Sequence, residues 1–233
     1  MANNYGYGKI VTNGLVFALD AGDNNSYPRS GTTWYDLAGS NNLTLYNSPS
    51  FSPNNGGHFV FDGANDYMTI QSPSINLSTT QISVSTWYWG NTTQTATTYF
   101  RGKNAAGGRE FLAHLPYSNG NIYWDAGDNG AANTAFNRIY KASSGAHVGW
   151  NHWVFTKNAT SGTMYIYRNG SLWHSGTGLT QNIGSIVAFE LGGHSGTYIY
   201  DNGKIANIQI YNRELSISEI TKNYNVQKSR FGL

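Results

Sequence analysis

Alternation between polar and apolar side chains is the feature of this sequence that most restricts its fold. Ile82–Trp89 alternates at every position, and Ile205–Tyr211 alternates as well. Successive side chains of a β-strand point to opposite faces of a sheet, so a period of two predicts strands. In the first segment, one face holds Ile82, Val84, Thr86 and Tyr88, and the other face holds Ser83, Ser85, Trp87 and Trp89. In the second segment, one face holds Ala206, Ile208 and Ile210, and the opposite face holds Asn207, Gln209 and Tyr211.

Short apolar segments separated by Gly, Asn and Ser clusters recur along the whole chain. This spacing is typical of an all-β sandwich or barrel, and the 17 Tyr, 7 Trp and 10 Phe suit half-buried strands. A chain of 233 residues is long enough for one such domain. The other predicted strands are Leu15–Leu19, His58–Phe61, Tyr67–Ile70, Thr98–Arg101, Glu110–His114, Asn121–Trp124, Trp153–Lys157, Thr163–Arg168, Ser171–His174 and Ile186–Leu191.

Two local motifs predict a turn and a helix. Asn169 and Gly170 are the residue pair that a type I′ turn prefers, because both central positions of that turn need a positive φ. Ser216 and Glu219 have the spacing of a capping box at the start of a helix. We expect this helix to end within Asn225–Gln227 and to cover one end or edge of the sandwich.

Charge and composition argue against several classes of partner. The net charge is only +2 and the 14 Lys and Arg are spread along the chain, so a nucleic-acid surface is not expected. The absence of cysteine excludes a disulfide scaffold and a thiolate zinc site. No segment approaches the ~20 apolar residues that span a bilayer, so membrane insertion is not expected. Met1–Lys9 lacks the pattern of a signal peptide, which favours synthesis and retention in a cytoplasm.

An ordered set of segments resembles a known family of β-sandwich domains. The segments are Gly14–Gly22, Thr32–Leu37, Phe61–Tyr67, Trp153–Thr156, Met164–Gly170 and Gly203–Ile220. The set resembles the laminin G-like domains of the concanavalin A-like lectin/glucanase type. It is similar in particular to versions carried by tailed-phage virion proteins, as is the ending Asn223–Leu233.

The resemblance implies an all-β fold, an antiparallel β-sandwich jelly roll with one short C-terminal helix. It places the laminin G-like domain at residues 14–233, after an N-terminal arm at residues 1–13. Family members bind carbohydrate or protein, often with a calcium ion at one rim. The resemblance thus implies a virion structural protein, either a capsid decoration protein or a tail adhesin.

Glycoside hydrolysis requires two carboxyl groups about 5–10 Å apart. The four glutamates, Glu110, Glu190, Glu214 and Glu219, have no second acid at i+2 or i+4 within a strand. The Glu-x-Asp-x-(x)-Glu strand motif of the related glucanases is also absent. The six histidines are scattered, and no nucleophile elbow or phosphate-binding loop occurs. We therefore expect that the protein is not an enzyme.

A calcium site and a sugar site are the two remaining kinds of chemistry. Calcium prefers carboxylate and carbonyl oxygens, which makes Asp125, Asp128 and Asn129 the best local set. The alternative is that these side chains stabilise turns by accepting backbone N–H bonds. Asp62 and Asp66 form a second, weaker set with the same alternative.

Sugars stack on aromatic rings and hydrogen-bond to polar side chains. Six aromatic residues are candidates, although most Trp of a sandwich lie in its core: Trp87, Trp89, Tyr123, Trp124, Trp173 and Tyr198. Tyr200 and His194 lie in the same Gly- and Asn-rich region as Tyr198. The predicted ligand-binding set is Trp124, Asp125, Asp128, Asn129, His194, Tyr198 and Tyr200.

These observations favour a binding or structural module over an enzyme. The expected partners are other virion proteins, such as major capsid or tail proteins, together with cell-surface glycans and further copies of the chain. The expected location is the virion. A free carbohydrate-binding lectin is the alternative, and a glycoside hydrolase is the third hypothesis.

Overall fold

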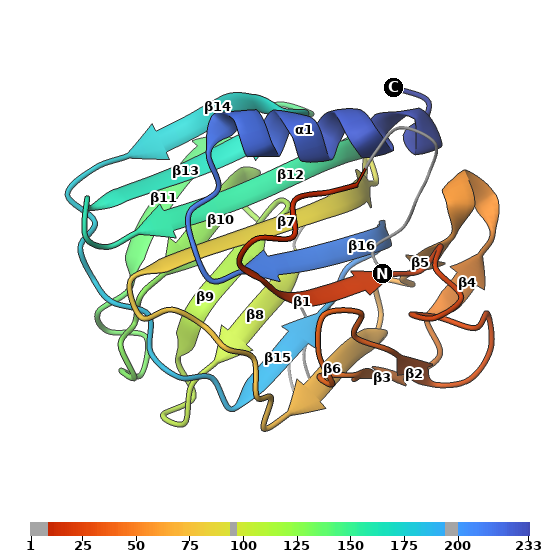
Figure 1. The fold of residues 1–233 in the computed structure, drawn as a ribbon, viewed down its shortest axis with the longest axis horizontal. Helices are drawn as coiled ribbons and strands as arrows, with labels where there is room; N and C mark the ends of the chain where they lie inside the picture. The colour runs from red at the N-terminus through yellow and green to blue at the C-terminus, as the bar shows by residue number, and fades with distance from the viewer. Residues whose placement is uncertain (1–8, 94–96, 194–199) are drawn as a thin grey trace.

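The computed structural model describes residues 9–93, 97–193 and 200–233, and these residues form two antiparallel sheets that face one another (Figure 1). Each sheet has eight strands within this part of the chain. The first sheet has the order β14 (Ser171–Gly176), β13 (Thr163–Arg168), β12 (Gly149–Asn158), β7 (Gln81–Gly90), β16 (Lys204–Tyr211), β5 (His58–Val60) and β4 (Ser50–Ser52), with β1 (Leu15–Asp20) also paired to β16.

The second sheet contains the candidate site. Its order is β11 (Asn137–Ala142), β10 (Asn121–Ala126), β9 (Arg109–His114), β8 (Phe100–Lys103), β15 (Ala188–Leu191), β6 (Tyr67–Gln71), β3 (Leu43–Tyr46) and β2 (Thr33–Trp34). A short helical turn, η1 (Asn54–Gly56), connects β4 and β5. The two sheets confirm the predicted β-sandwich with one short C-terminal helix.

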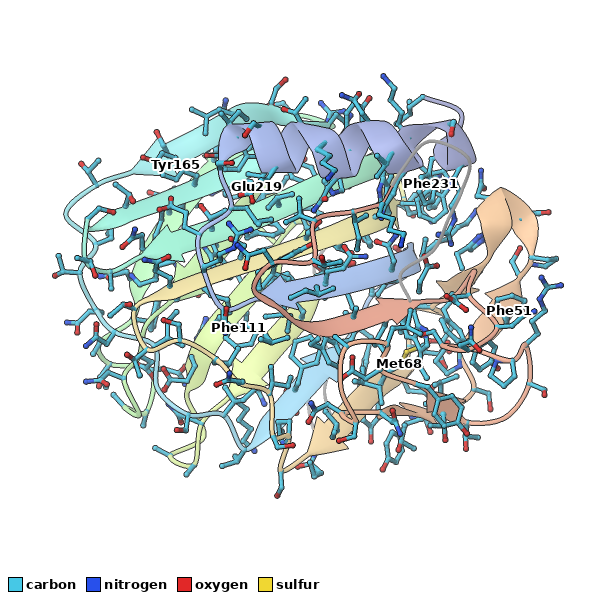
Figure 2. The ribbon with its side chains drawn as sticks, in the orientation of Figure 1. Phe51, Met68, Phe111, Tyr165, Glu219 and Phe231 are labelled. Atoms are coloured by element: carbon cyan, nitrogen blue, oxygen red, sulfur yellow. The ribbon has the colours of Figure 1, made fainter. Side chains whose placement is uncertain are left out.

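The inward faces of both sheets form one aromatic core. Phe17, Phe100, Phe155 and Phe189 are fully buried there, and Phe100 contacts Phe155 edge to face at 5.6 Å between ring centroids. Figure 2 labels Met68 and Phe111, two further core side chains with no exposed surface. Burial of this apolar area is the main force that holds the sheets together.

Helix α1 (Ile217–Gln227) and the turn η2 (Lys228–Phe231) cover the outer face of the first sheet (Figure 1). The capping box is confirmed, because Ser216 accepts the backbone N–H of Glu219 and the Glu219 carboxylate accepts the N–H of Ser216. Phe231, which is labelled in Figure 2, stacks on Trp87 of β7 with 4.0 Å between ring centroids. The helix and the following turn therefore cover part of this face of the sandwich.

Local sequence signals are confirmed at the turn between β13 and β14. Asn169 and Gly170 have φ values of 51° and 79°, as a type I′ turn requires, and Arg168 pairs with Ser171. The face assignment of β7 is also confirmed, since Ile82, Val84 and Tyr88 enter the core.

One face assignment is wrong, that of Ala206. Ile208 and Ile210 lie in the core as expected, but Ala206 packs with Trp87 on the outer face. The reason is a break in register between β16 and β7 at Ile205 to Asn207, which is a β-bulge. A bulge shifts the alternation by one residue, so Ile205 occupies the core in place of Ala206.

Part of the predicted N-terminal arm packs on the domain. Val11 is buried, its N–H donates to Asn223 Oδ1 at 2.8 Å, and its carbonyl accepts the hydroxyl of Tyr211 at 3.0 Å. Residues 1–8 lie outside the described part of the chain. Within the described residues, no helix is long and apolar enough to cross a membrane.

Candidate functional site

The outer face of the second sheet has a continuous row of cross-strand neighbours. Strand register places these side chains directly opposite one another, and at least one neighbour of each along its own strand lies in the core. The row crosses seven strands and consists of Thr44, Thr69, Glu190, Arg101, Leu112, Asp125 and Arg138. We call it the outer row.

Asp125 is the most heavily bonded member of the outer row. Its carboxylate accepts from Arg138 through Nε at 2.6 Å and Nη2 at 2.6 Å, and from Arg109 Nη1 at 2.9 Å. The Asp125 side chain is fully buried, whereas those of Arg109 and Arg138 are 23% and 35% exposed. The hydrogen bonds from Arg138 to this carboxylate raise the pKa of its guanidinium. Two arginines thus share one carboxylate.

A second ion pair lies two strands away in the same row. Arg101 Nε donates to Glu190 Oε2 at 2.6 Å, and the two side chains are 14% and 8% exposed. The two terminal nitrogens of Arg101 form no hydrogen bond with any described residue. They are therefore available as donors.

Aromatic side chains border this charged group. Tyr123 stacks on Tyr140 with 5.2 Å between ring centroids, and the guanidinium of Arg138 lies 4.6 Å from the Tyr123 centroid. Tyr117 is half-buried and its ring centroid is 4.7 Å from that of His114. Burial lowers the pKa of His114 to about 4, against the effect of a hydrogen bond to the Thr97 carbonyl. His114 is therefore neutral near pH 7.

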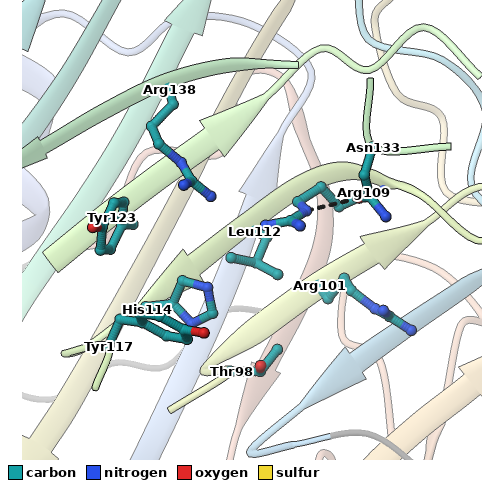
Figure 3. Close-up of a pocket in the computed structure, with 9 residues that line it drawn as sticks. All are labelled: Thr98, Arg101, Arg109, Leu112, His114, Tyr117, Tyr123, Asn133 and Arg138. Atoms are coloured by element: carbon teal, nitrogen blue, oxygen red, sulfur yellow. Dashed lines mark hydrogen bonds between the residues drawn. The ribbon is translucent and has the colours of Figure 1, made fainter. Parts of the chain in front are cut away.

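These side chains surround a pocket of about 300 Å³ on the outer face of the second sheet. Figure 3 shows Tyr117, Tyr123 and His114 on one side, with Arg101 and Arg109 on the other and Leu112 between them. The complete lining is Thr98, Arg101, Arg109, Leu112, His114, Tyr117, Tyr123, Asn133 and Arg138. The pocket thus combines apolar surface with several hydrogen-bond donors, which is typical of small-ligand sites.

The buried side chain of Asp128 holds the exposed loop that carries Asn133 at the rim of the pocket. Asp128 accepts the backbone N–H of Asn133 at 2.7 Å and that of Ala135 at 3.0 Å. Asn129 donates its N–H to Glu110 Oε2 at 3.1 Å and has a φ of 48°. Asp128 is fully buried, so its oxygens serve the turn, as the alternative interpretation of the sequence expected.

The structure separates the residues of the predicted ligand-binding set. Trp124 lies in the core and donates its indole N–H to the Thr156 carbonyl at 2.9 Å, so it offers no exposed ring. Asp125 is part of the outer row, and Tyr200 lies away from the pocket near Tyr67, with 6.5 Å between ring centroids. His194 and Tyr198 lie outside the described residues.

The structure also places the other aromatic candidates and the calcium candidates. Trp87 is buried under η2, Trp89 lies beside the Lys204 amine, and Trp173 packs on Trp153. Asp125 uses both oxygens for arginine, and among the described residues no group of three His, Asp or Glu side chains is arranged to bind a metal ion. The neighbours of Asp125 are therefore cations rather than further carboxylates.

Three arginines of the site escape prediction from the sequence. Arg101, Arg109 and Arg138 are far apart in the chain and converge only through strand register. One signal was present, because Tyr123 and Asp125 flank the apolar Trp124 and must share its opposite face. That signal predicts an outward-facing Tyr and Asp but not their partners.

The fold is a concanavalin A-like sandwich. It has two facing sheets, a C-terminal helix on the first sheet and a pocket on the outer face of the second. The model of the concanavalin A-like lectin/glucanases superfamily (laminin G type 3) matches residues 62–221, which is more than half of the chain. The chain belongs to this family. No curated protein matches the sequence.

Solved structures of the same architecture include binding domains of bacterial toxins. The botulinum neurotoxin serotype G binding domain has a TM-score of 0.71 and 18% identity over 92% of this chain. The serotype D binding domain has a TM-score of 0.69 and 17% identity over 91%. A serotype D ligand-binding domain in complex with N-acetylneuraminic acid has a TM-score of 0.69 and 16% identity over 91%. The chain spans about half the length of each, 50 to 51%, and these likenesses show the shared fold.

Proposed function

We propose that this chain is a glycan-binding module whose ligand occupies the pocket on the outer face of the second sheet. The observation that carries the proposal is the composition of this pocket. Half-buried Tyr117 and the floor residue Leu112 offer apolar surface, while Arg101, Arg109 and Asn133 offer hydrogen-bond donors and acceptors. A pyranose ring has the matching chemistry, an apolar face bordered by hydroxyl groups.

The arrangement of acids supports binding rather than hydrolysis. Asp125 and Glu190 are the two carboxylates of the outer row, and Leu112 and Arg101 separate them. Three strand intervals place their backbones roughly 14 Å apart. Hydrolysis requires carboxyl groups about 5–10 Å apart, and both of these acids are already engaged by arginine.

The comparisons support the same class of function. The family is named for lectins and glucanases. The similar structures are binding domains of neurotoxins, and one of them is a complex with N-acetylneuraminic acid. For this chain, a lectin-like role of the sandwich is our inference.

Replacing Tyr117 with alanine is expected to weaken glycan binding by about 2- to 12-fold, because a stacked aromatic ring contributes roughly 0.5–1.5 kcal/mol. The ligand is first identified on a glycan array with the wild-type chain, and affinities are then measured by calorimetry. Tyr35, 43% exposed and outside the pocket lining, provides the control variant Tyr35→Ala with unchanged affinity. A wild-type chain that binds no glycan would contradict the proposal.

We further propose that the module is displayed on a tailed-phage virion, as capsid decoration or tail adhesin. The resemblance of its segments to phage virion domains and its Asn-, Thr- and Tyr-rich composition support this. Deleting residues 2–9 should reduce attachment to the particle while the melting temperature stays unchanged. Attachment is measured by co-purification of the chain with particles and by cryo-electron microscopy of those particles. A chain that is never found on particles, yet binds glycans, would favour the free lectin.

A further inference from the structure

The pocket has more positively charged arginines than carboxylates bonded to them. Arg101, Arg109 and Arg138 line the cavity, and the carboxylates bonded to them are Asp125 and Glu190. Three guanidinium groups against two carboxylates leave one positive charge in excess. Because His114 is uncharged near pH 7, it does not change this balance. A neutral sugar would leave that excess charge without a counterion.

The arginines are held in place before any ligand arrives. Asp125 binds Arg109 and Arg138 at 2.6–2.9 Å, and Phe136 lies against both, 4.7 Å from the Arg109 guanidinium carbon and 5.0 Å from that of Arg138. Glu190 holds the Nε of Arg101 at 2.6 Å. Side chains fixed in this way lose little conformational entropy when a ligand binds.

Arg101 has the free donors that an anionic group needs. Its Nε is occupied by Glu190, while its terminal nitrogens have no hydrogen-bond partner among the described residues. A guanidinium offers paired N–H donors that match the two oxygens of a carboxylate. Hydrogen bonds between two charged groups are about twice as strong as those between neutral ones.

We propose that the pocket selects acidic sugars, with the ligand carboxylate on the terminal nitrogens of Arg101 and the sugar ring between Leu112 and Tyr117. This inference rests on the proposed glycan-binding function and names the ligand class of that site. The ring and the carboxylate have separate partners on opposite sides of the pocket (Figure 3). An acidic sugar therefore satisfies both sides at once.

The test compares ligands that differ only in charge. Sialyllactose is measured against its carboxyl methyl ester, and oligogalacturonate against its methyl ester, by calorimetry at pH 7. At least one acid is expected to bind about tenfold more tightly than its neutral partner, and this preference should fall as sodium chloride is raised from 0.05 to 0.5 M, since salt screens charge. Equal binding of acid and neutral ligand would overturn this inference and leave the glycan-binding function intact. A chain that binds none of the four would overturn this inference, and one that also binds nothing on the glycan array would overturn the glycan-binding function.

Two variants locate the effect at Arg101. Arg101→Lys keeps the charge but loses the paired donors, so the preference for the acid should fall about fivefold. The double variant Arg101→Gln/Glu190→Gln removes the paired donors without leaving Glu190 unpaired and keeps the excess charge of one, so the preference should fall to twofold or less. The melting temperature of each variant is measured first. If the preference survives in a folded double variant, the acid is recognised elsewhere and the assignment is wrong.

Discussion

Replacing Asp125 with asparagine is expected to lower the free energy of unfolding by about 3 kcal/mol. The substitution keeps the size of the side chain but removes the charge that Arg109 and Arg138 share. Two guanidinium groups are then left close together over a fully buried amide. Loss of one partner from a buried ion pair costs about 3–5 kcal/mol, and the partial exposure of both arginines places this case at the lower end.

Urea denaturation of wild type and variant measures this loss. A matched variant, Arg138→Gln in the Asp125→Asn background, should recover at least 1 kcal/mol, because it removes one of the two unpaired cations. The same experiment separates the ion pair from the calcium interpretation of the sequence. If Asp125 binds only the two arginines, neither millimolar calcium nor EDTA changes the melting temperature of the wild type. A rise with calcium in the wild type but not in Asp125→Asn would show that Asp125 binds metal instead.

Much of the fold could be predicted from local signals. The alternation in β7, the Asn169-Gly170 turn and the Ser216 capping box each depend on residues within ten positions of one another, and all three are confirmed. Four strands were missed, β2, β3, β4 and β11. Three of them have only two to four residues, and β11 is a polar edge strand in which only Ile139 is buried. Such segments form strands because their neighbours offer free backbone groups, which the local pattern does not reveal.

The site was less predictable than the fold, for a physical reason. The sequence predicts Asp125 as a ligand-binding or calcium residue, but in the structure its carboxylate binds Arg109 of β9 and Arg138 of β11. Which side chains face each other across strands depends on register, and a shift by one residue would move every one of them to the opposite face. The β-bulge at Ala206 shows that one extra residue in a strand is enough to make the alternation assign a side chain to the wrong face.

Asp201 is a buried acid with one unused oxygen. Its Oδ1 accepts the Tyr88 hydroxyl at 2.8 Å and the Gly203 N–H at 2.7 Å, while its Oδ2 has no hydrogen-bond partner among the described residues. Burial raises the pKa of this carboxyl to about 7, although interactions with the Tyr88 hydroxyl and with the backbone of Gly203 and Asn202 act in the opposite direction. A charge at this position is therefore unfavourable in the folded protein.

Replacing Asp201 with asparagine is expected to stabilise the protein relative to wild type, and the gain should grow as the pH rises. In the unfolded chain the carboxyl loses its proton near pH 4, whereas in the folded protein it keeps that proton until about pH 7. Between these values unfolding releases a proton, so the stability of the wild type falls with rising pH. The asparagine side chain does not titrate in this range, so its contribution to stability does not change with pH. The difference in unfolding free energy should be near zero at pH 4 and on the order of 3 kcal/mol at pH 8.

Urea denaturation at pH 4, 6 and 8 measures the difference. Tyr88→Phe provides a second variant, since it removes a hydrogen bond that lowers the Asp201 pKa and so extends the window above pH 7. The protonated carboxyl and the amide are both neutral and both leave donor hydrogens unpaired at the Oδ2 position, so their contributions to stability are similar at low pH. A difference that stays constant from pH 4 to pH 8 would mean that Asp201 is ionised in the folded protein throughout, and that water or a cation reaches its second oxygen.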